Sequence, residues 1–146
     1  MAVISRYFIY RKEKMRARII LYCPTIKAVL LIHRINKRDY WVVPGGQAHK
    51  GETARETALR ELKEELGIEL AARDLTLLYQ LDQDNEQQIF FKATSKLIRA
   101  PLIQGEERTR SSSTNIYHPE WVKLKDIAKI NLMPPQIAAR LAADNA

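Results

Sequence analysis

Residues 46–68 read GQAHKGETARETALRELKEELGI, and this segment carries the strongest local signals in the chain. Thr53 and Glu56 are spaced as in a capping box, in which two side chains satisfy free backbone amides at the start of a helix. Gly67 supplies a C-terminal stop, because glycine readily adopts the left-handed conformation that ends many helices. The segment therefore predicts a helix over about residues 53–66.

One side of the predicted helix is apolar. Its apolar residues recur at intervals of three and four, which places them along one stripe that should face a core. They are Ala54, Ala58, Leu59, Leu62 and Leu66.

Three glutamates crowd the end of the same helix. Glu61, Glu64 and Glu65 stand at positions i, i+3 and i+4, so their carboxylates are neighbours. Each like-charged pair costs roughly 0.2–0.5 kcal/mol, and acids near a helix C-terminus cost roughly 0.3–1 kcal/mol each against the macrodipole. Taken alone, the acids also fit a solvated surface. A bound divalent cation would offset their repulsion, and oxygen ligands favour Mg²⁺, with Mn²⁺ as the alternative.

The flanking residues decide between these interpretations. Their spacing, Gly-x5-Glu-x7-Arg-Glu-Leu-x-Glu-Glu-x-Gly-Ile, resembles the signature of the Nudix hydrolases at nine fixed positions within 23 residues. This resemblance implies an α/β/α sandwich with a mixed β-sheet, in which the segment forms a loop, a helix and a loop that hold a metal ion. It covers the rest of the chain only through the strand pattern.

The resemblance implies a role for each acid of the segment. Glu61 and Glu65 look like the principal metal ligands, and Glu64 looks like a ligand of an additional metal or of its water. The carbonyl of Gly45 resembles a further ligand, because the glycines after Pro44 permit close approach of the backbone.

Two other residues of the segment resemble supporting groups. Glu52 looks like an acid that positions the ligands, and Arg60 resembles the arginine that holds Glu61 by a salt bridge. His49 stands where the family often has an acid, which puts an accessory ligand in doubt, and we assign His49 no role.

The general base stays open, because members of the family take it either from the helix or from a later loop. The polar stretch 104–115 is long for a connection, as binding loops and lids often are. The candidate bases are Glu64, Glu106, Glu107 and Glu120. We favour Glu107 from the loop, which makes Glu61, Glu64 and Glu107 the predicted catalytic residues.

Aromatic and arginine side chains are candidates for holding the rest of a nucleotide. Bases stack on aromatic faces, and guanidinium groups bind phosphates through two donors. The predicted substrate-binding residues are Arg18, Trp41, Arg108, Arg110 and Tyr117, with Trp121 as a further candidate. Packing within the sheet is the alternative role for both tryptophans.

Length and composition limit the organisation of the chain. With 146 residues and 46% hydrophobic composition, we expect a single domain over residues 1–146, with 1–14 as an edge strand or flexible arm. No apolar run is long enough to span a bilayer, so we expect a cytoplasmic protein without membrane contact. The single cysteine, Cys23, lies in an apolar stretch and is expected to be buried.

The pattern of β-branched and aliphatic residues predicts six strands and a second helix. The strands are expected at 16–23, 26–35, 40–43, 75–81, 87–98 and 116–124, with a polar turn containing Asp82, Asp84 and Asn85, and the helix at about 136–142.

The first hypothesis for function is metal-dependent hydrolysis of a nucleoside diphosphate linked to a group X. The formal charge of +7 suits a small anionic nucleotide, and it also suits an RNA 5′ end or a dinucleoside polyphosphate as the alternative substrate. A nucleotide-sensing regulator is the non-enzyme alternative, which the retained acids disfavour. The sequence leaves the oligomeric state open, with a dimer among the options.

Overall fold

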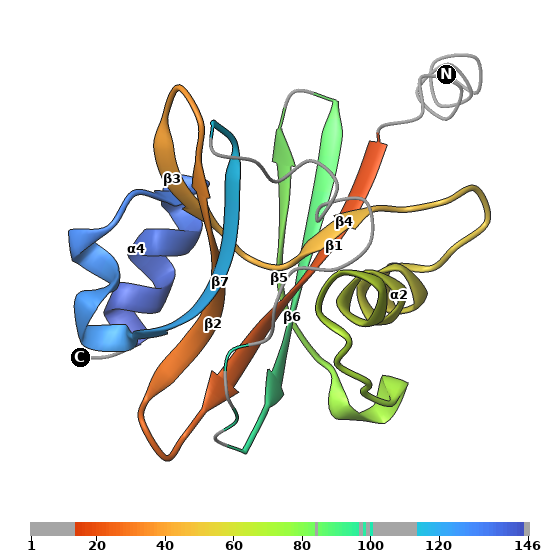
Figure 1. The fold of residues 1–146 in the computed structure, drawn as a ribbon. Coiled ribbons are helices and arrows are strands. Elements are labelled where there is room, and N and C mark those ends of the chain that lie inside the picture. The colour runs from red at the N-terminus through yellow and green to blue at the C-terminus, as the bar shows by residue number, and fades with distance from the viewer. Residues whose placement is uncertain (1–13, 84, 97, 99, 101–113, 145–146) are drawn as a thin grey trace.

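The chain folds around one eight-stranded mixed sheet in the computed structural model, which describes residues 14–83, 85–96, 98, 100 and 114–144. The strand order is β5-β6-β1-β2-β3-β8, while β4 pairs with β1 and β7 pairs with β2 (Figure 1). The strands are β1 Lys14–Cys23, β2 Ala28–Ile35, β3 Asp39–Val42, β4 Gly45–Gln47, β5 Thr76–Gln83, β6 Glu86–Thr94, β7 Ile116–Lys123 and β8 Leu132–Met133.

The predicted helix of the 46–68 segment is α2, Ala54–Leu66. The Thr53 side chain accepts from the backbone N–H of Glu56, and the Glu56 side chain accepts from the backbone N–H of Thr53. The capping box is therefore confirmed. Gly67 closes the helix with a φ of 66°. Both ends of α2 therefore follow from local sequence.

Three shorter or later helices complete the fold. Helix α4 spans Pro135–Asp144, two residues longer at its C-terminal end than the sequence predicted. The 3-10 helices η1, Ala72–Asp74, and η2, Leu124–Lys129, were not predicted. Short 3-10 turns lack the periodicity of an α-helix, so the sequence gives no comparable signal for them.

Helices cover both faces of the sheet, as the α/β/α prediction requires (Figure 1). Neighbouring residues of the central strands point to opposite faces. In β1, Ile19 packs in the cluster that contains Leu62 of α2, whereas Ile20 packs in the cluster that contains Ile137 of α4. Strands buried on both faces read as continuous apolar runs, which is why β1 and β2 were readily predicted.

The sheet is split between β1 and β2. These strands pair only at one end, through Tyr22 with Val29 and through Cys23 with Ala28. Beyond that point, the edge of β1 that faces β2 pairs instead with β4, while its other edge pairs with β6 in parallel. Strand β2 pairs with β3 and β7. The strands diverge in Figure 1, and the opening between them positions the site described below.

Two sequence predictions about strands need correction. Strand β4 was not predicted, because its Gly45-Gly46-Gln47 sequence has low strand propensity and forms a strand only by pairing with β1. The strand expected at 87–98 ends at Thr94, and Asp82, expected in the turn, is part of β5. Asp84, which was also expected in this turn, lies outside the described residues.

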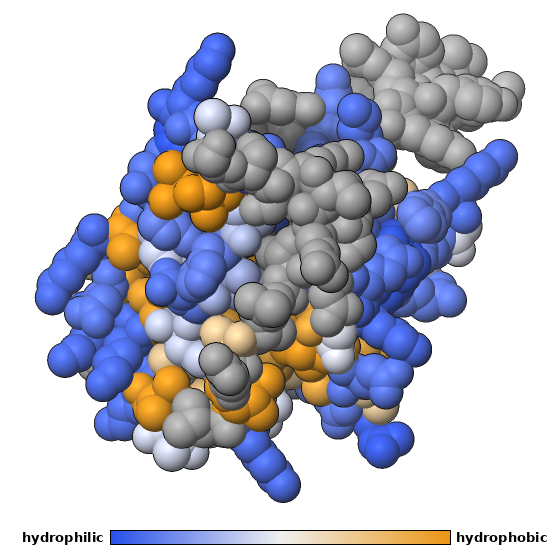
Figure 2. Space-filling view, viewed as in Figure 1, coloured by the Kyte–Doolittle hydropathy of each residue, from blue (hydrophilic) through white to orange (hydrophobic). Residues whose placement is uncertain are grey.

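Surface and burial agree with the expectations from composition. Hydrophilic side chains dominate the face seen in Figure 2, and the large hydrophobic residues exposed within the described chain are Leu77 and Ile98. Cys23 is buried, as predicted. None of the helices in the described residues is both long and apolar enough to cross a bilayer.

Candidate active site

Arg60 binds the carboxylates of three glutamates. Its Nε donates to Glu52 Oε2 at 2.7 Å, and its Nη1 donates to Glu61 Oε1 at 3.0 Å and to Glu64 Oε2 at 3.1 Å. Its Nη2 donates to Glu52 Oε1 at 3.0 Å and to the Gln47 carbonyl at 3.0 Å. The guanidinium therefore fixes the loop before α2 to the acidic side of the helix and offsets the repulsion expected among the acids.

Glu52 is held most tightly of these acids. The paired hydrogen bonds from Arg60 are the main cause that lowers the Glu52 pKa to about 2. The His49 amide and the Thr57 hydroxyl also donate to Glu52 Oε1, at 2.7 Å and 3.1 Å. Glu52 thus stays ionised and ties the loop to α2.

The Glu61 carboxylate lies against the backbone of Gly46 in β4. A Cβ atom at position 46 would stand 2.5 Å from Glu61 Cδ and 2.7 Å from each carboxylate oxygen. Any residue other than glycine would therefore displace this carboxylate. Arg60 engages Oε1 of Glu61, and Oε2 accepts no hydrogen bond within the described part of the chain.

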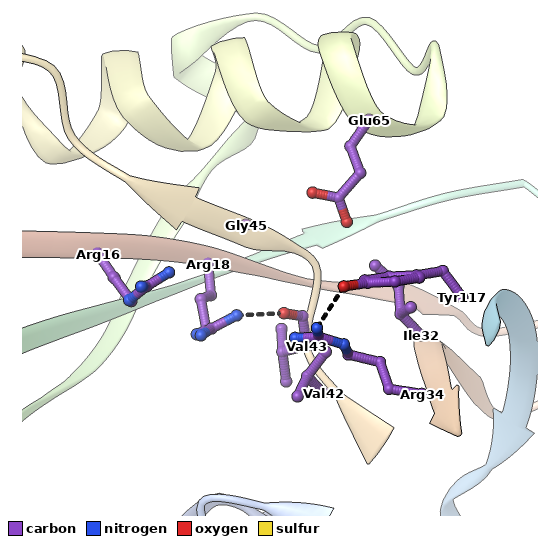
Figure 3. A pocket seen from close by; sticks show the side chains of 9 residues that line it. All are labelled: Arg16, Arg18, Ile32, Arg34, Val42, Val43, Gly45, Glu65 and Tyr117. Carbon is purple, nitrogen blue, oxygen red and sulfur yellow. Dashed lines mark hydrogen bonds between the residues drawn. The ribbon is translucent and has the colours of Figure 1, made fainter. Parts of the chain in front are cut away.

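Gly45 brings the backbone of β4 against β1 beside these acids. Its φ of 149° is open only to glycine, and a Cβ there would meet the Ala17 carbonyl oxygen at 2.1 Å. Gly45 and Glu65 line the same cavity, into which the Glu65 side chain points from the last turn of α2 (Figure 3). Glu65 is buried, with 8% of its surface exposed, despite being an acid.

These donors fit a hard divalent cation. Carboxylate and backbone carbonyl oxygens are the ligands that Mg²⁺ and Mn²⁺ prefer, and the two glycines give the room that a cation beside the backbone needs. Within the described ranges no three His, Cys, Asp or Glu side chains already stand close enough together to hold a metal ion. Glu61 and Glu64 instead turn toward Arg60.

The cavity at the split of the sheet has a volume of about 80 Å³. Its wall combines three arginines with apolar and aromatic side chains (Figure 3). The lining residues are Arg16, Arg18, Ile32, Arg34, Val42, Val43, Gly45, Glu65 and Tyr117.

The arginines of β1 are held by neighbouring strands. Arg16 Nε pairs with Glu86 Oε2 at 2.9 Å. Arg18 donates from Nη1 to the Val43 carbonyl at 2.8 Å and from Nε to Gln88 Oε1 at 3.0 Å. Burial is the main cause that lowers the pKa of Arg18 to about 10; the nearby charge of Arg16 contributes to the lowering and that of Glu65 opposes it, so Arg18 remains charged at neutral pH.

Two of the predicted substrate-binding residues line the cavity, and a third does not. Arg18 and Tyr117 are in its wall. Trp41 points to the other face of the sheet, where it packs against the α4-side core and stacks on His33 with a 4.1 Å centroid distance. The alternation of side chains in β3 gives Val42, not Trp41, the position at the cavity.

Two further candidates, both in β7, are not among the residues that line the cavity. Tyr117 and Glu120 are three residues apart in β7, so their side chains point to opposite faces of the sheet. Glu120 is on the same face as Val122, which packs in the α4-side core. Its carboxylate stands 3.9 Å from His118 Nδ1. Trp121 donates from Nε1 to the Ile98 carbonyl at 2.8 Å and packs against the α2-side core. The remaining predicted site residues lie outside the described residues: Glu106, Glu107, Arg108 and Arg110.

The sequence analysis missed two arginines of the cavity, Arg16 and Arg34. Arg16 and Arg18 are two apart in an apolar strand, a spacing that puts both on one face and was available as a signal. Arg34 likewise interrupts the apolar run of β2. Nothing local marks the contact of Gly46 with Glu61.

Comparison with known families decides the classification of the chain. The NUDIX domain model matches residues 13–142, which include the helix, the split sheet and the cavity. The chain belongs to the Nudix family. The resemblance of the 46–68 segment is thereby confirmed.

Named relatives of this Nudix chain include two diphosphatases. Dihydroneopterin triphosphate diphosphatase of Escherichia coli strain K12 is 38% identical over 60 residues, covering 41% of this chain and 40% of that protein. The match thus spans less than half the length of this relative. Putative 8-oxo-dGTP diphosphatase 2 of Mycobacterium tuberculosis strain H37Rv is 34% identical over 106 residues, covering 64% of this chain and 71% of that protein.

Solved structures share the fold. A MutT structure from work on Aliivibrio salmonicida and Vibrio cholerae superposes with a TM-score of 0.68 at 20% identity, covering 90% of this chain and 98% of that chain. The E. coli dihydroneopterin triphosphate pyrophosphohydrolase gives a TM-score of 0.58 at 19% identity, covering 80% of this chain and 85% of that chain. The mixed sheet with helices on both faces is thus the Nudix fold.

Proposed function

We propose that this Nudix chain hydrolyses a phosphoanhydride bond in a nucleoside diphosphate linked to a group X, with Mg²⁺ or Mn²⁺ as cofactor. The observation that carries the proposal is the convergence of Glu61 and Glu65 on the glycine pair of β4, with Arg60 fixing the surrounding acids. Relatives named as diphosphatases of triphosphate compounds support the same reaction class.

The carboxylates and the backbone would share the metal. Glu61, Glu65 and the Gly45 carbonyl would hold the cation, and Glu64 would bind a second ion or its water. A divalent ion there would neutralise charge on phosphate oxygens and lower the pKa of a bound water. Arg60 and Glu52 would act by keeping Glu61 in place.

The chemistry requires one proton acceptor. Oxygen of a water molecule forms a bond to phosphorus, the bridging P–O bond breaks, and the leaving phosphate departs with the bridging oxygen. The proton of the water passes to a carboxylate, for which Glu64 and Glu107 are the candidates. Glu64 is suited to this because its side chain is 58% exposed and reachable by water.

Anionic substrates would be attracted by the cavity and the whole chain. Three arginines in the wall against one buried glutamate give the cavity a surplus of positive charge. The formal charge of +7 acts in the same direction over longer distances.

The test measures phosphate or pyrophosphate release from a panel of nucleotides and nucleoside diphosphate conjugates with Mg²⁺. Glu61→Gln and Glu65→Gln should each lower kcat by at least 100-fold, because each removes a charged oxygen ligand. Glu69→Gln is the matched control. Glu69 is exposed, its carboxylate lies 2.9 Å from Lys63 Nζ, and neither residue lines the cavity.

Three outcomes separate the alternatives. Release from RNA 5′ ends or dinucleoside polyphosphates, well above release from the conjugates, would favour the alternative substrates that the positive charge also suits. Tight nucleotide binding without turnover would favour a sensor. Equal activity of the Glu69→Gln, Glu61→Gln and Glu65→Gln variants would contradict the assignment of the acids.

A further inference from the structure

Thr57 is a polar residue that helix α2 buries completely, with 0% of its surface exposed. Its Oγ1 lies 3.1 Å from Glu52 Oε1 and 2.9 Å from the Thr53 carbonyl oxygen. A hydroxyl has one proton to donate, so these two acceptors compete for it. The acceptor that receives the proton determines whether Thr57 only reinforces the helix or also holds the acids of the site.

The Glu52 carboxylate is the favoured acceptor of the Thr57 proton. It is ionised, and hydrogen bonds to charged acceptors are roughly twice as strong as those between neutral groups. The Thr53 carbonyl already accepts the backbone N–H of Thr57 at 3.0 Å. With the proton turned away from Glu52, two oxygen atoms 3.1 Å apart would face one another without a proton between them. The hydroxyl therefore donates to Glu52, and it contributes, after Arg60 and the His49 amide, to lowering the Glu52 pKa.

Thr57 is the most rigid of the residues that donate to Glu52. The other donors are Arg60, whose side chain has several rotatable bonds, and the amide of His49, which belongs to the exposed loop before α2. The side chain of Thr57 is short, and its branched Cβ and full burial restrict its rotation. The Thr57 hydroxyl thus gives the Glu52 carboxylate a fixed point on the helix itself.

Arg60 connects the position of Glu52 to two acids of the site. Nε and Nη2 of its guanidinium donate to the two carboxylate oxygens of Glu52. Nη1 of the same planar group donates to Glu61 Oε1 at 3.0 Å and to Glu64 Oε2 at 3.1 Å. Because the guanidinium is a rigid plane, one side of it cannot shift without the other. Movement of Glu52 therefore moves the donor that holds Glu61 and Glu64.

We propose that Thr57 is a positioning residue for the acids of the site. Its hydroxyl fixes the Glu52 carboxylate, which in turn aligns the Arg60 guanidinium. That guanidinium sets where the carboxylates of Glu61 and Glu64 stand. The inference rests on the proposed function, in which these two acids are a metal ligand and a candidate proton acceptor. It adds a residue that lies outside the cavity lining and acts only through other side chains.

Thr57→Val and Thr57→Ser separate the hydroxyl from the shape of the side chain. Valine keeps the branched shape and lacks the donor. We expect kcat with Mg²⁺, for the best nucleotide of the panel, to fall at least fivefold while KM changes less than twofold. Serine keeps the donor and loses a buried methyl group, so it should lower the midpoint of urea unfolding and keep kcat within twofold of wild type. If Thr57 served stability alone, both folded variants would keep the wild-type kcat.

The Arg60 Nε–H reports on the same contacts without any turnover, because its hydrogen bond to Glu52 Oε2 protects it from exchange with water. Its exchange rate, measured by NMR, should rise at least fivefold in Thr57→Val and stay at the wild-type value in Thr57→Ser. Thr57→Ala also lacks the hydroxyl, and alanine is the best helix former, so this variant should exchange as fast as Thr57→Val.

Ala58→Gly is the matched control. Glycine weakens the same turn of α2, but Ala58 packs in the α2-side core and not against the acids. This variant should lower the midpoint of urea unfolding and keep both kcat and the Arg60 exchange rate within twofold of wild type.

The exchange rates separate this inference from the proposed function. If the wild type hydrolyses no nucleotide of the panel, the proposed function fails, and faster exchange in Thr57→Val and Thr57→Ala but not in Thr57→Ser still supports the positioning role. Wild-type exchange in Thr57→Val and Thr57→Ala overturns the inference, even where kcat falls, because the effect then does not pass through Arg60. Equal changes in Thr57→Val and Thr57→Ser also overturn it, because the hydroxyl is then not the cause.

Discussion

Arg60 is the residue on which the acidic side of the site depends. The sequence predicted mutual repulsion among Glu61, Glu64 and Glu65, and it predicted a salt bridge only between Arg60 and Glu61. The structure adds Glu52 and Glu64 to the partners of Arg60. The hydrogen bonds that Arg60 donates to Glu52 and Glu61 raise the Arg60 pKa, with Glu52 as the largest cause. The Arg60 guanidinium alone thus organises the acidic side of the site.

At the residue scale, the Glu52–Arg60 pair predicts a pH dependence of stability. The folded-state pKa of Glu52 is depressed to about 2, so its stabilising contribution is present above the unfolded-state pKa of about 4.3. That contribution is lost as the pH falls from this value toward the folded-state pKa. We therefore expect Glu52→Gln to lower the free energy of unfolding at pH 7, and we expect the difference from wild type to shrink as the pH falls.

Urea unfolding of both proteins between pH 7 and pH 2.5 measures this difference. The wild type at each pH is the reference, so general acid destabilisation cancels. A difference that stays constant over this range would show that the pair does not lower the Glu52 pKa as described.

At the scale of elements, strand β4 is a narrow spacer between β1 and helix α2. Its two glycines allow the Ala17 carbonyl on one side and the Glu61 carboxylate on the other to approach the same short backbone segment. This arrangement lets the Glu61 carboxylate of the helix lie directly against the backbone of β4. Larger residues in β4 would separate the helix acids from the backbone.

Gly46→Ala should therefore lower activity more than stability. The added methyl group overlaps the Glu61 carboxylate, which is the far end of a flexible side chain and can swing away. We expect kcat/KM for the best nucleotide of the panel to fall at least tenfold and the free energy of unfolding to change by less than about 1 kcal/mol.

Gly51→Ala gives the opposite pattern and serves as the control. No atom lies within 4 Å of a Cβ built there, but the φ of 85° is strained for alanine. A loss of stability of about 1–3 kcal/mol with activity retained is expected. If Gly46→Ala is fully active, the Glu61 carboxylate does not act from its position beside β4.

At the scale of the whole molecule, the sheet separates two cores. The α2-side cluster contains Ile19 and Leu62, and the α4-side cluster contains Ile20 and Ile137. The two clusters share the backbone of the central strands but no buried side chain. Packing changes on one side should therefore be transmitted weakly to the other.

A double-mutant cycle tests this separation. Ile19→Val and Ile137→Val each delete one buried methylene group, which typically costs about 0.5–1.5 kcal/mol. Because the two residues lie on opposite faces, the double variant should lose the sum of the two costs to within about 0.5 kcal/mol. Measured by urea unfolding, a coupling energy above about 1 kcal/mol would show that the two cores act as one packing unit.

The elements that the sequence predicted are those whose signals are local. The capping box, the apolar stripe and the terminal glycine of helix α2 all lie within fifteen residues. The central strands were predicted from their continuous apolar runs, which are buried on both faces of the sheet. The acids of the site lie in the same segment, so their residues were predicted together with the helix. Strand β4 and the 3-10 helices were missed because their sequences carry no such periodicity.

By itself, then, the sequence determined which acids belong together and which segments form the sheet, because neighbours along a helix or strand are fixed by its geometry. Only the tertiary structure decided what faces those acids. The pairing of β7 with β2 brings Arg34 to Tyr117, 83 positions away in the chain, and the split between β1 and β2 leaves both beside the cavity that Glu65 also lines. Such contacts depend on strand pairing over long separations, which side-chain pattern alone does not specify.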